Sequence, residues 1–385
     1  MEFAFTEEQQ MIRDTAESFF TNVSGSEAVR KAMATERGFD DQLWQQLCQE
    51  LYLQAITVPE DFGGMGLGFV ELVAVMEQMG RFVACVPFFS TVCQAVTALL
   101  LAANEAQKTE YFGRILEGQV ATLAFTANGN WTTDGVTASY QKQGDAYQLN
   151  GEYRYVIDGH TADFLIIAAR EEGSTGHEGI ALFVLPADSK GIERQWLPTM
   201  DQTRKQASVR LDGVTVAADA LMAGNAADTL AKILDLAAIA LAAEQVGGAQ
   251  QVLDMSVAYT KERVQFNRPV ASFQSVKHKA ADMMTRVEAA RSGVYYAACI
   301  AQEALEQGPL ADELQEAASI AKGNASETYF KNAGDALQLH GGVGFTWEYD
   351  VHLYFKRAKA SELYLGNAAF HRERLAAKLL GGVES

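Results

Sequence analysis

The amino-acid sequence predicts an α+β protein of three consecutive parts: an N-terminal helical domain at residues 1–118, a middle antiparallel β-barrel domain at 119–225 and a C-terminal helical bundle at 226–385. Two observations support this prediction. Apolar residues recur at helical spacing in the first and last parts, and at a spacing of two in the middle part. No proline occurs between Pro198 and Pro269, which permits long uninterrupted helices after the middle part.

Helix-start signals mark the N-terminal domain. Thr6 and Gln9 have the spacing of a capping box, and an apolar helical series follows them. A second helix can begin at Asp40 or Asp41, because an aspartate side chain accepts hydrogen bonds from the first free N–H groups of a helix. We expect two further helices, at 71–79 and 92–103.

The stretch 58–68 in this domain contains a Gly-x-Gly-x-Gly pattern. A proline and an acidic pair precede the glycines, and the strand–turn–helix setting of a dinucleotide-binding fingerprint is missing. The stretch therefore predicts a structural loop.

Short apolar segments, separated by Gly, Asp and Asn, follow in the middle domain and predict strands linked by hairpin-like turns. They lie at 120–125, 147–149, 153–156, 164–168 and 180–185. After Ala226 the apolar residues return to helical spacing, as in the series from Ile233 through Leu241 to Val246. Long helices without proline favour a bundle.

Composition excludes several functions. Apolar residues make up 48% of the chain and charged residues 21%, as in an ordinary globular protein. The net charge of −18 repels phosphate, so nucleic acid is not an expected partner. No uncharged apolar run is long enough to span a membrane. The four cysteines show no CxxC pair, which favours reduced thiols and a cytoplasmic protein.

Two motifs point to a phosphate-bearing cofactor. Gln338 begins a glycine-rich stretch that includes Gly341 and Gly342, and Arg263–Phe266 lies earlier in the chain. Glycines allow backbone N–H groups to approach a ligand, and an arginine can bind phosphate oxygens through two parallel hydrogen bonds. Taken alone, Arg263 could be a solvated helix charge beside Glu262.

These motifs, together with Thr6–Gln9, the loop 58–68 and the stretch 150–163, resemble in order the motifs of the acyl-CoA dehydrogenase family along nearly the whole chain. The resemblance implies that family's fold, FAD as cofactor and α,β-dehydrogenation of an acyl-CoA substrate. It also implies an electron-transfer flavoprotein as a possible acceptor.

In that family each FAD lies across a subunit interface, and the resemblance assigns one half of that site to this chain. Arg263 matches the arginine on the diphosphate, and Phe266 matches the neighbouring aromatic residue. Gln338, Gly341 and Gly342 match the loop near the adenosine end. Asn267 replaces the usual glycine after the aromatic residue, although asparagine tolerates the left-handed conformation.

The other half departs from the family pattern. Leu365 stands where most members have the catalytic glutamate, and a leucine cannot accept a proton. Ile157 replaces the threonine beside the flavin ring, and the stretch 126–134 differs from the family's Thr-Glu-Pro segment. A second branch of the family places its base at the position of Ala237. No catalytic base is therefore assigned.

Because the departures cluster on one half, the sequence indicates a subunit that completes the flavin site of an unlike acyl-CoA dehydrogenase subunit in a hetero-oligomer, such as a tetramer. Such paired unlike subunits occur in bacterial steroid side-chain degradation, and the resemblance implies a bulky, steroid-like acyl-CoA substrate.

Three alternatives stay open. The first is a self-sufficient homo-oligomer in which Glu244 is a relocated base. It lies about two helical turns beyond Ala237 on the same face, roughly 10 Å away. The second is a non-redox scaffold subunit, and the third is a flavin monooxygenase on the same fold. His371 has no second histidine at metal spacing and is expected on a surface helix; we expect no metal site.

Overall fold

The computed structural model describes residues 5–381, which form two compact units. The helical unit comprises the residues up to Arg30, Phe69–Ala84 and the residues from Ala238 onward. The sheet unit comprises Lys31–Gly68 and Cys85–Ala237. The division into three domains at 118/119 and 225/226 stays a prediction.

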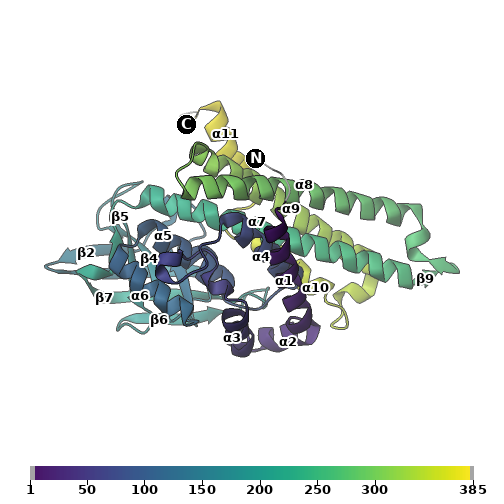
Figure 1. Ribbon diagram of the computed structural model, residues 1–385, viewed down its shortest axis with the longest axis horizontal. Helices are drawn as coiled ribbons and strands as arrows, with labels where there is room; N and C mark the ends of the chain where they lie inside the picture. The colour runs from purple at the N-terminus through teal and green to yellow at the C-terminus, as the bar shows by residue number, and fades with distance from the viewer. Residues whose placement is uncertain (1–4, 382–385) are drawn as a thin grey trace. The chain divides into compact units, whose positions relative to one another are not determined.

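Helices come first, strands follow, and helices close the chain (Figure 1). The helices are α1 (Glu7–Val23), α2 (Ser26–Ala34), α3 (Asp41–Glu50), α4 (Phe69–Arg81), the π-helix η3 (Phe89–Val96), α5 (Thr97–Ala102), α6 (Glu105–Leu116), α7 (Ala227–Glu262), α8 (Gln274–Leu305), α9 (Leu314–His340), α10 (Val351–Leu363) and α11 (Ala368–Leu380). The strands are β1 (Ala121–Ala124), β2 (Ser139–Gln143), β3 (Ala146–Ile157), β4 (Phe164–Glu171), β5 (Ile180–Pro186), β6 (Ile192–Leu197), β7 (Gln206–Ala217), β8 (Leu221–Ala223), β9 (Val264–Gln265) and β10 (Arg268–Pro269). This order confirms the predicted fold class.

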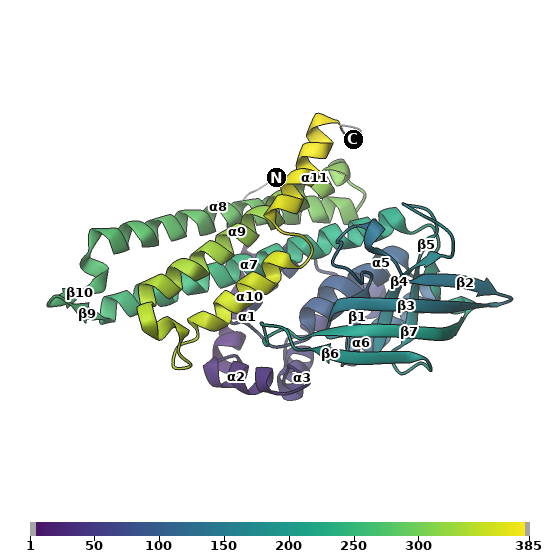
Figure 2. The same cartoon turned by 180° about the vertical axis from the view of Figure 1, so that it is seen from behind.

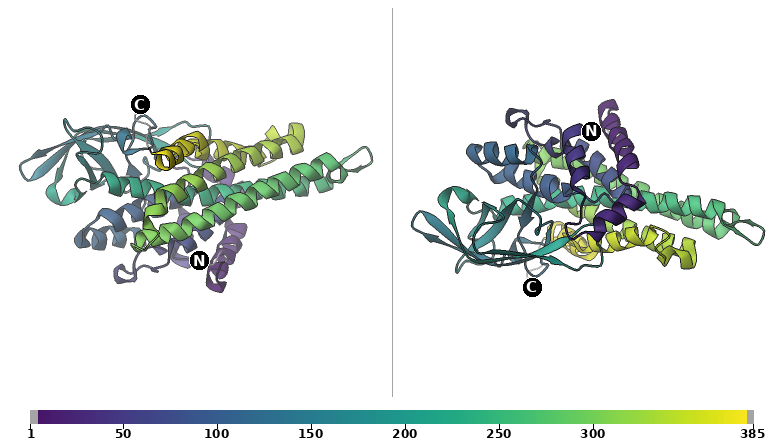
Figure 3. Two further views of the ribbon diagram at one scale, coloured as in Figure 1. Left: turned by 90° about the horizontal axis from the view of Figure 1, so that it is seen from above. Right: turned by 90° about the horizontal axis from the view of Figure 1, so that it is seen from below.

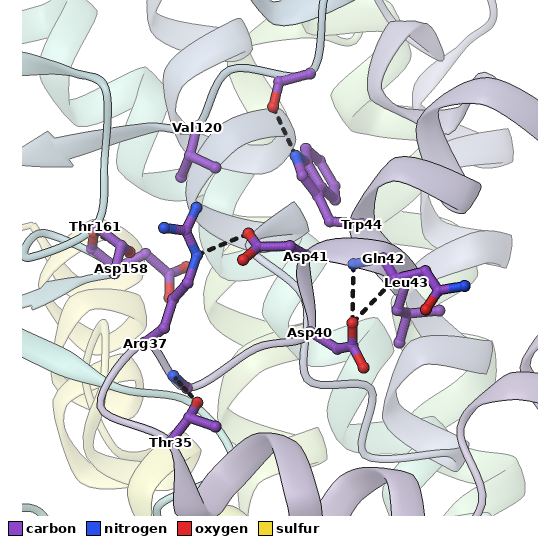
Figure 4. Close-up of polar contacts among 12 residues, drawn as sticks. Thr35, Arg37, Asp40, Asp41, Gln42, Leu43, Trp44, Val120, Asp158 and Thr161 are labelled. Atoms are coloured by element: carbon purple, nitrogen blue, oxygen red, sulfur yellow. Dashed lines mark hydrogen bonds and ion pairs between the residues drawn. The ribbon is translucent and has the colours of Figure 1, made fainter.

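The predicted helix starts are confirmed. The Thr6 hydroxyl accepts from the backbone N–H of Gln9, and the Gln9 side chain accepts from that of Thr6, which completes the capping box of α1. Asp40 caps α3 by accepting from Gln42 and Leu43 (Figure 4). The helix expected at 92–103 is divided between η3 and α5.

The glycine-rich stretch 58–68 is a loop, as predicted, with one short 3-10 turn, η2 (Glu60–Phe62). A Cβ at Gly64 would lie 2.0 Å from the carbonyl oxygen of Val58. This glycine therefore serves the loop's own packing rather than ligand binding.

The strands of the sheet unit form one eight-stranded sheet in the order β6-β7-β3-β2-β4-β5-β8, with β1 paired to β4 (Figure 2). The predicted antiparallel barrel is corrected in two respects. β1 and β2 run parallel to β4, because the chain between these strands is long enough to cross over. The end strands β6 and β8 do not pair with each other within the described residues, so the sheet stays open.

The helical unit is built around α9, which packs against α8, α10 and α11. α4 and α7 cross closely at two glycines: a Cβ at Gly80 would lie 1.9 Å from the Glu244 carbonyl oxygen, and one at Gly247 would lie 1.7 Å from that of Glu77. The β9–β10 hairpin joins α7 to α8 and projects beyond the neighbouring helices (Figures 1 and 3). In the described part of the chain, every helix is too short or too polar to cross a membrane.

Candidate active site

The segment after α7 and the end of α9 meet in the helical unit. Arg263 directly follows α7. Its Nη1 donates to the carbonyl oxygen of His340, the last residue of α9, at 3.1 Å, and also to the Tyr259 hydroxyl. The structure therefore brings together the two motifs that the sequence singles out, Arg263–Phe266 and Gln338–Gly342.

An aromatic pair supports this junction. The Tyr259 ring stacks on the His340 imidazole, with ring centroids 4.3 Å apart and 17° between the planes. Nδ1 of His340 lies 2.8 Å from the Ala336 carbonyl. Burial lowers the pKa of His340, and the Arg263 guanidinium lowers it further, so that the ring is neutral near pH 7 and donates to this carbonyl. Sequence reasoning gave Tyr259 no role, although a tyrosine four residues before an arginine lies on the same helix face.

The remaining guanidinium nitrogens fit a diphosphate. Within residues 5–381, only Nη1 of Arg263 donates to polar groups of the chain, and the N–H groups of Nε and Nη2 remain available to a ligand. The side chain is half-buried, and its anchored Nη1 fixes the direction of the group. Such a pre-oriented fork suits bidentate binding of phosphate oxygens.

The glycines after α9 leave room for a ligand. Gly341 has φ of 64° and ψ of −146°, a conformation open to glycine and costly for other residues. Added Cβ atoms at Gly341 and Gly342 would meet nothing within 4 Å, whereas one at Gly344 would contact His340 at 3.1 Å. Packing within the chain thus accounts for Gly344 but not for Gly342. Gln338 is exposed one turn earlier.

The β9–β10 hairpin carries an exposed aromatic ring. Phe266 and Asn267 both have positive φ, 53° and 59°, as the two central residues of a tight hairpin turn do. Asparagine at 267 therefore meets the same conformational demand as glycine. The Phe266 side chain is 86% exposed, and its ring touches Phe273 edge-on. A large apolar side chain held in this way is typical of a residue that is covered by a partner.

In contrast, the loop 126–134 in the sheet unit is occupied with its own contacts. The Asn128 side-chain oxygen accepts from Thr126 and from the N–H of Asn130, and Asn130 in turn accepts from Thr132. The Trp131 ring lies near those of Phe125 and Tyr155, at 6.0 and 6.3 Å between centroids. These contacts fold the loop's polar and aromatic groups onto one another.

The position that the resemblance places beside a flavin ring is also apolar. Ile157 ends β3 and is buried, and its carbonyl accepts from the Thr122 hydroxyl at 2.7 Å. Its hydrocarbon side chain offers no donor to a flavin nitrogen.

Leu365 lies in the turn between α10 and α11. It is 3% exposed and has a φ of 58°, which is unfavourable for leucine. Gly366 follows with φ of 93°, and a Cβ there would lie 2.2 Å from the Phe370 ring. His371, expected on a surface helix, is instead buried, because its Nε2 bonds to the Leu365 carbonyl oxygen at 3.0 Å.

Glu244, the candidate relocated base, is buried in α7, and its Oε1 accepts from Nη1 of Arg357 at 2.9 Å. The ion pair engages the carboxylate within the core, and this arrangement favours a structural role. Ala237 is fully buried and carries no titratable group.

A cleft of about 440 Å³ lies beside α3 in the sheet unit. Arg37 pairs with Asp41 at 2.8 Å, and the Trp44 indole donates to the Gly118 carbonyl (Figure 4). Asp158 nearby is bound to the Ser90 hydroxyl at 2.6 Å. Because these polar groups pair among themselves, the cleft carries no assigned chemistry. Within residues 5–381, no cluster of His, Cys, Asp and Glu could hold a metal ion.

The fold, together with the family models that match it, places the chain among flavin-dependent oxidoreductases. Two family models match the chain: the acyl-CoA dehydrogenase N-terminal domain at residues 6–119 and the acyl-CoA dehydrogenase C-terminal domain at residues 227–380. The chain belongs to the acyl-CoA dehydrogenase family, whose enzymes use FAD and act on CH–CH bonds.

Individual proteins agree with this assignment. The chain is 31% identical to acyl-CoA dehydrogenase IpdE2 of Mycolicibacterium smegmatis, over 97% of this chain and 99% of that one. It is similar to the ChsE4–ChsE5 complex of Mycobacterium tuberculosis, with a TM-score of 0.89, 27% identity and coverage of 99% of each chain. It is also similar to the steroid ACAD Tcur3481–Tcur3483, with a TM-score of 0.85, 30% identity and coverage of 98% and 99%.

Proposed function

We propose that this chain is the complementing subunit of a hetero-oligomeric acyl-CoA dehydrogenase. In this proposal it supplies Arg263, Phe266, Gln338, Gly341 and Gly342 to an FAD whose flavin ring is held by an unlike subunit. The observation that carries the proposal is the contrast between the pre-oriented Arg263 guanidinium and a base position filled by Leu365.

FAD, when bound, supplies the acceptor for the hydride equivalent that leaves the acyl chain. The chain's own residues would bind and orient the cofactor. Arg263 offers Nε and Nη2 to the diphosphate, and the open backbone at Gly341 and Gly342 admits the adenosine end. Phe266, at the end of the hairpin, would be covered on assembly and exclude water from the shared site.

Removal of the α-proton is then assigned to the partner. Leu365 and Ala237 cannot accept a proton, and the Glu244 carboxylate is engaged by Arg357. The similarity to the ChsE4–ChsE5 complex and to a steroid ACAD supports an unlike partner and a bulky, steroid-like acyl-CoA substrate. We further propose an electron-transfer flavoprotein as acceptor, and a cytoplasmic location in keeping with four cysteines that form no disulfide, Cys48, Cys85, Cys93 and Cys299.

The flavin absorbance of the purified full-length chain, with its mass in solution, tests this proposal. We expect a colourless chain alone and a yellow complex after co-expression with an unlike acyl-CoA dehydrogenase subunit. A yellow homo-oligomer with one flavin per chain would overturn it and favour either the relocated-base enzyme or the flavin monooxygenase. A complex that is active and keeps its full flavin content when Arg263 is changed to Ala would favour the non-redox scaffold subunit.

A further inference from the structure

A lysine ammonium group lies inside the helical unit, at the end of α10. Lys322 is on α9, which packs against α10 and α11 (Figure 2), and it is fully buried. Its Nζ lies 3.0 Å from the Ser361 carbonyl oxygen and 3.3 Å from that of Glu362. The Gly366 carbonyl oxygen is 2.9 Å away, and the Ser326 hydroxyl oxygen is 2.8 Å away. We call these four oxygens the oxygen cage.

A series of buried hydrogen bonds fixes the Ser326 hydroxyl as an acceptor toward Lys322. Ser326 Oγ donates its own proton to Oε1 of Gln245, on α7, at 3.2 Å. Nε2 of Gln245 donates to the Ser361 hydroxyl at 3.2 Å, and that hydroxyl donates to the Ala358 carbonyl oxygen. The Ser326 proton therefore points away from Nζ. Because the other members of the cage are backbone carbonyls, which only accept, the cage presents acceptors alone.

Acceptors that are buried together in this way require a cation. An ammonium group has N–H donors and no acceptor, whereas a neutral amine would turn a lone pair toward one of the oxygens. The carbonyls of Ser361 and Glu362 belong to the last turn of α10, where the helix dipole favours positive charge. No carboxylate oxygen belongs to the cage. Neutral oxygens suit a monovalent cation, whereas calcium sites include carboxylates and magnesium keeps several of its waters.

We propose that the oxygen cage is a binding site for a monovalent cation, and that Lys322 fills this site with its own ammonium group. The chain thereby carries the cation covalently attached, and the turn between α10 and α11 does not depend on the ions in the medium. Once the lysine stem is removed, the cage should accept a free alkylammonium ion or potassium. None of these contacts involves a flavin or an acyl-CoA, so the cage is independent of the proposed function.

Chemical rescue of Lys322→Ala in the full chain tests this proposal. n-Propylammonium has the carbons and the ammonium group that the substitution removes. n-Propanol is the neutral control of similar length, and tetramethylammonium is a cation that donates no N–H hydrogen bond. Unfolding in urea is measured at pH 6, because burial lowers the pKa of Lys322 to about 7 and the wild-type chain should be compared in its ammonium form.

We expect Lys322→Ala to unfold at a lower urea concentration than the wild type, and propylammonium to raise its midpoint. Above the dissociation constant, each tenfold increase in propylammonium should raise the folded-to-unfolded ratio about tenfold. Potassium should raise the ratio less, because it leaves the space of the lysine stem empty. The wild type and Lys331→Ala, which changes an exposed lysine of α9, should show no such response.

Rescue by propanol equal to that by propylammonium would overturn the proposal, because the site would then require only the apolar stem. Equal rescue by tetramethylammonium would show a general salt effect and would also overturn it, as would no rescue at all. If Lys322→Ala does not fold without a ligand, the yield of folded chain after refolding with each compound replaces the urea midpoint.

The wild-type chain offers a second measurement that needs no rescue. With ¹⁵N-labelled lysine, the Lys322 side chain should give an ammonium signal at pH 6 whose protons exchange slowly with water, because they are hydrogen-bonded and buried. Loss of this signal in Lys322→Met assigns it. A neutral amine at this position, or exchange as fast as that of the exposed lysines, would contradict a cage filled by a cation.

Discussion

The Arg263–Gly342 junction and the Thr126–Asp134 loop differ in how their polar groups are used. In the junction, two guanidinium nitrogens have no polar partner within residues 5–381, and added Cβ atoms at two glycines would meet nothing within 4 Å. In the loop, asparagine and threonine side chains bond to one another, and aromatic rings close around Trp131. Polar groups without a partner in the chain are available to a ligand, whereas groups that bond to one another are not.

The largest effect should come from Arg263→Ala in the assembled complex. Loss of a charge-assisted pair to the diphosphate should weaken FAD retention roughly 10- to 100-fold. The measurement is the ratio of flavin to protein after gel filtration. Arg210→Ala, which changes an exposed arginine on β7, is the matched control and should leave this ratio unchanged. Equal flavin content in both variants would remove the basis for assigning the diphosphate to Arg263.

The free energy of unfolding should fall in acid because of His371, which lies beside the turn that holds Leu365. Burial lowers the pKa of His371 to about 3, with smaller contributions from Lys322 and Arg374. The folded-state pKa lies below the unfolded value of about 6.5, so the unfolded chain binds more protons between these values. The stability contributed by neutral His371 is therefore complete above pH 6.5 and is lost as pH falls toward 3.

Its loss should approach about 1.4 kcal/mol per pH unit in that window. Urea midpoints at pH 7 and pH 5 measure it, and His371→Phe isolates it from His340 and His352, whose pKa values burial also lowers. A wild-type midpoint that falls no more steeply than that of the variant would show that His371 is protonated without cost.

A smaller effect is expected from Gly342→Ala. Because the new Cβ meets nothing in the chain, thermal stability should stay the same, while FAD affinity of the complex falls roughly two- to tenfold. Gly344→Ala should do the opposite, since its Cβ would press on His340 and Leu337. The two variants separate ligand approach from internal packing. Equal effects of the two variants on FAD affinity would contradict the assignment of Gly342 to ligand approach.

Leu365→Glu should produce no turnover in the chain alone. A restored carboxyl group does not restore the flavin contacts that Ile157 and the loop 126–134 lack. The readouts are flavin absorbance and acyl-CoA-dependent dye reduction. A yellow, active homo-oligomer would show that one residue separates this chain from a self-sufficient enzyme.

The sequence predicted the fold class and most helix starts, because capping residues and helical periodicity are local signals. The strands at 139–143, 192–197 and 206–217 were missed. β7 alternates buried residues such as Val209 with exposed ones such as Arg210, so it lacks the continuous apolar run that marked the predicted strands. The parallel pairing of β1 with β4 depends on tertiary crossover, which no local pattern encodes.

Within the candidate site, the sequence identified the motifs but not their supports. Lys322 lies in a stretch of small residues, and a lysine in such a stretch is predicted to be exposed. Its burial depends on backbone carbonyls near the end of α10, such as that of Gly366, which accept from Nζ. His371 was placed on the surface for the same reason. Buried polar residues depend on partners from other helices, and those partners are distant in sequence.

The projecting hairpin has a consequence for stoichiometry. In a symmetric pair each copy would both offer its β9–β10 hairpin and receive one. A pair of this chain alone would therefore place two hairpins over two sites, and neither site would contain a catalytic base. An unlike pair has only one productive direction, and it should contain one flavin for every two chains. The sequence of the partner's own corresponding hairpin is then under no requirement to bind FAD. Its sequence should show the reverse losses: a carboxylate at the position of Leu365, and no requirement for an arginine at that of Arg263.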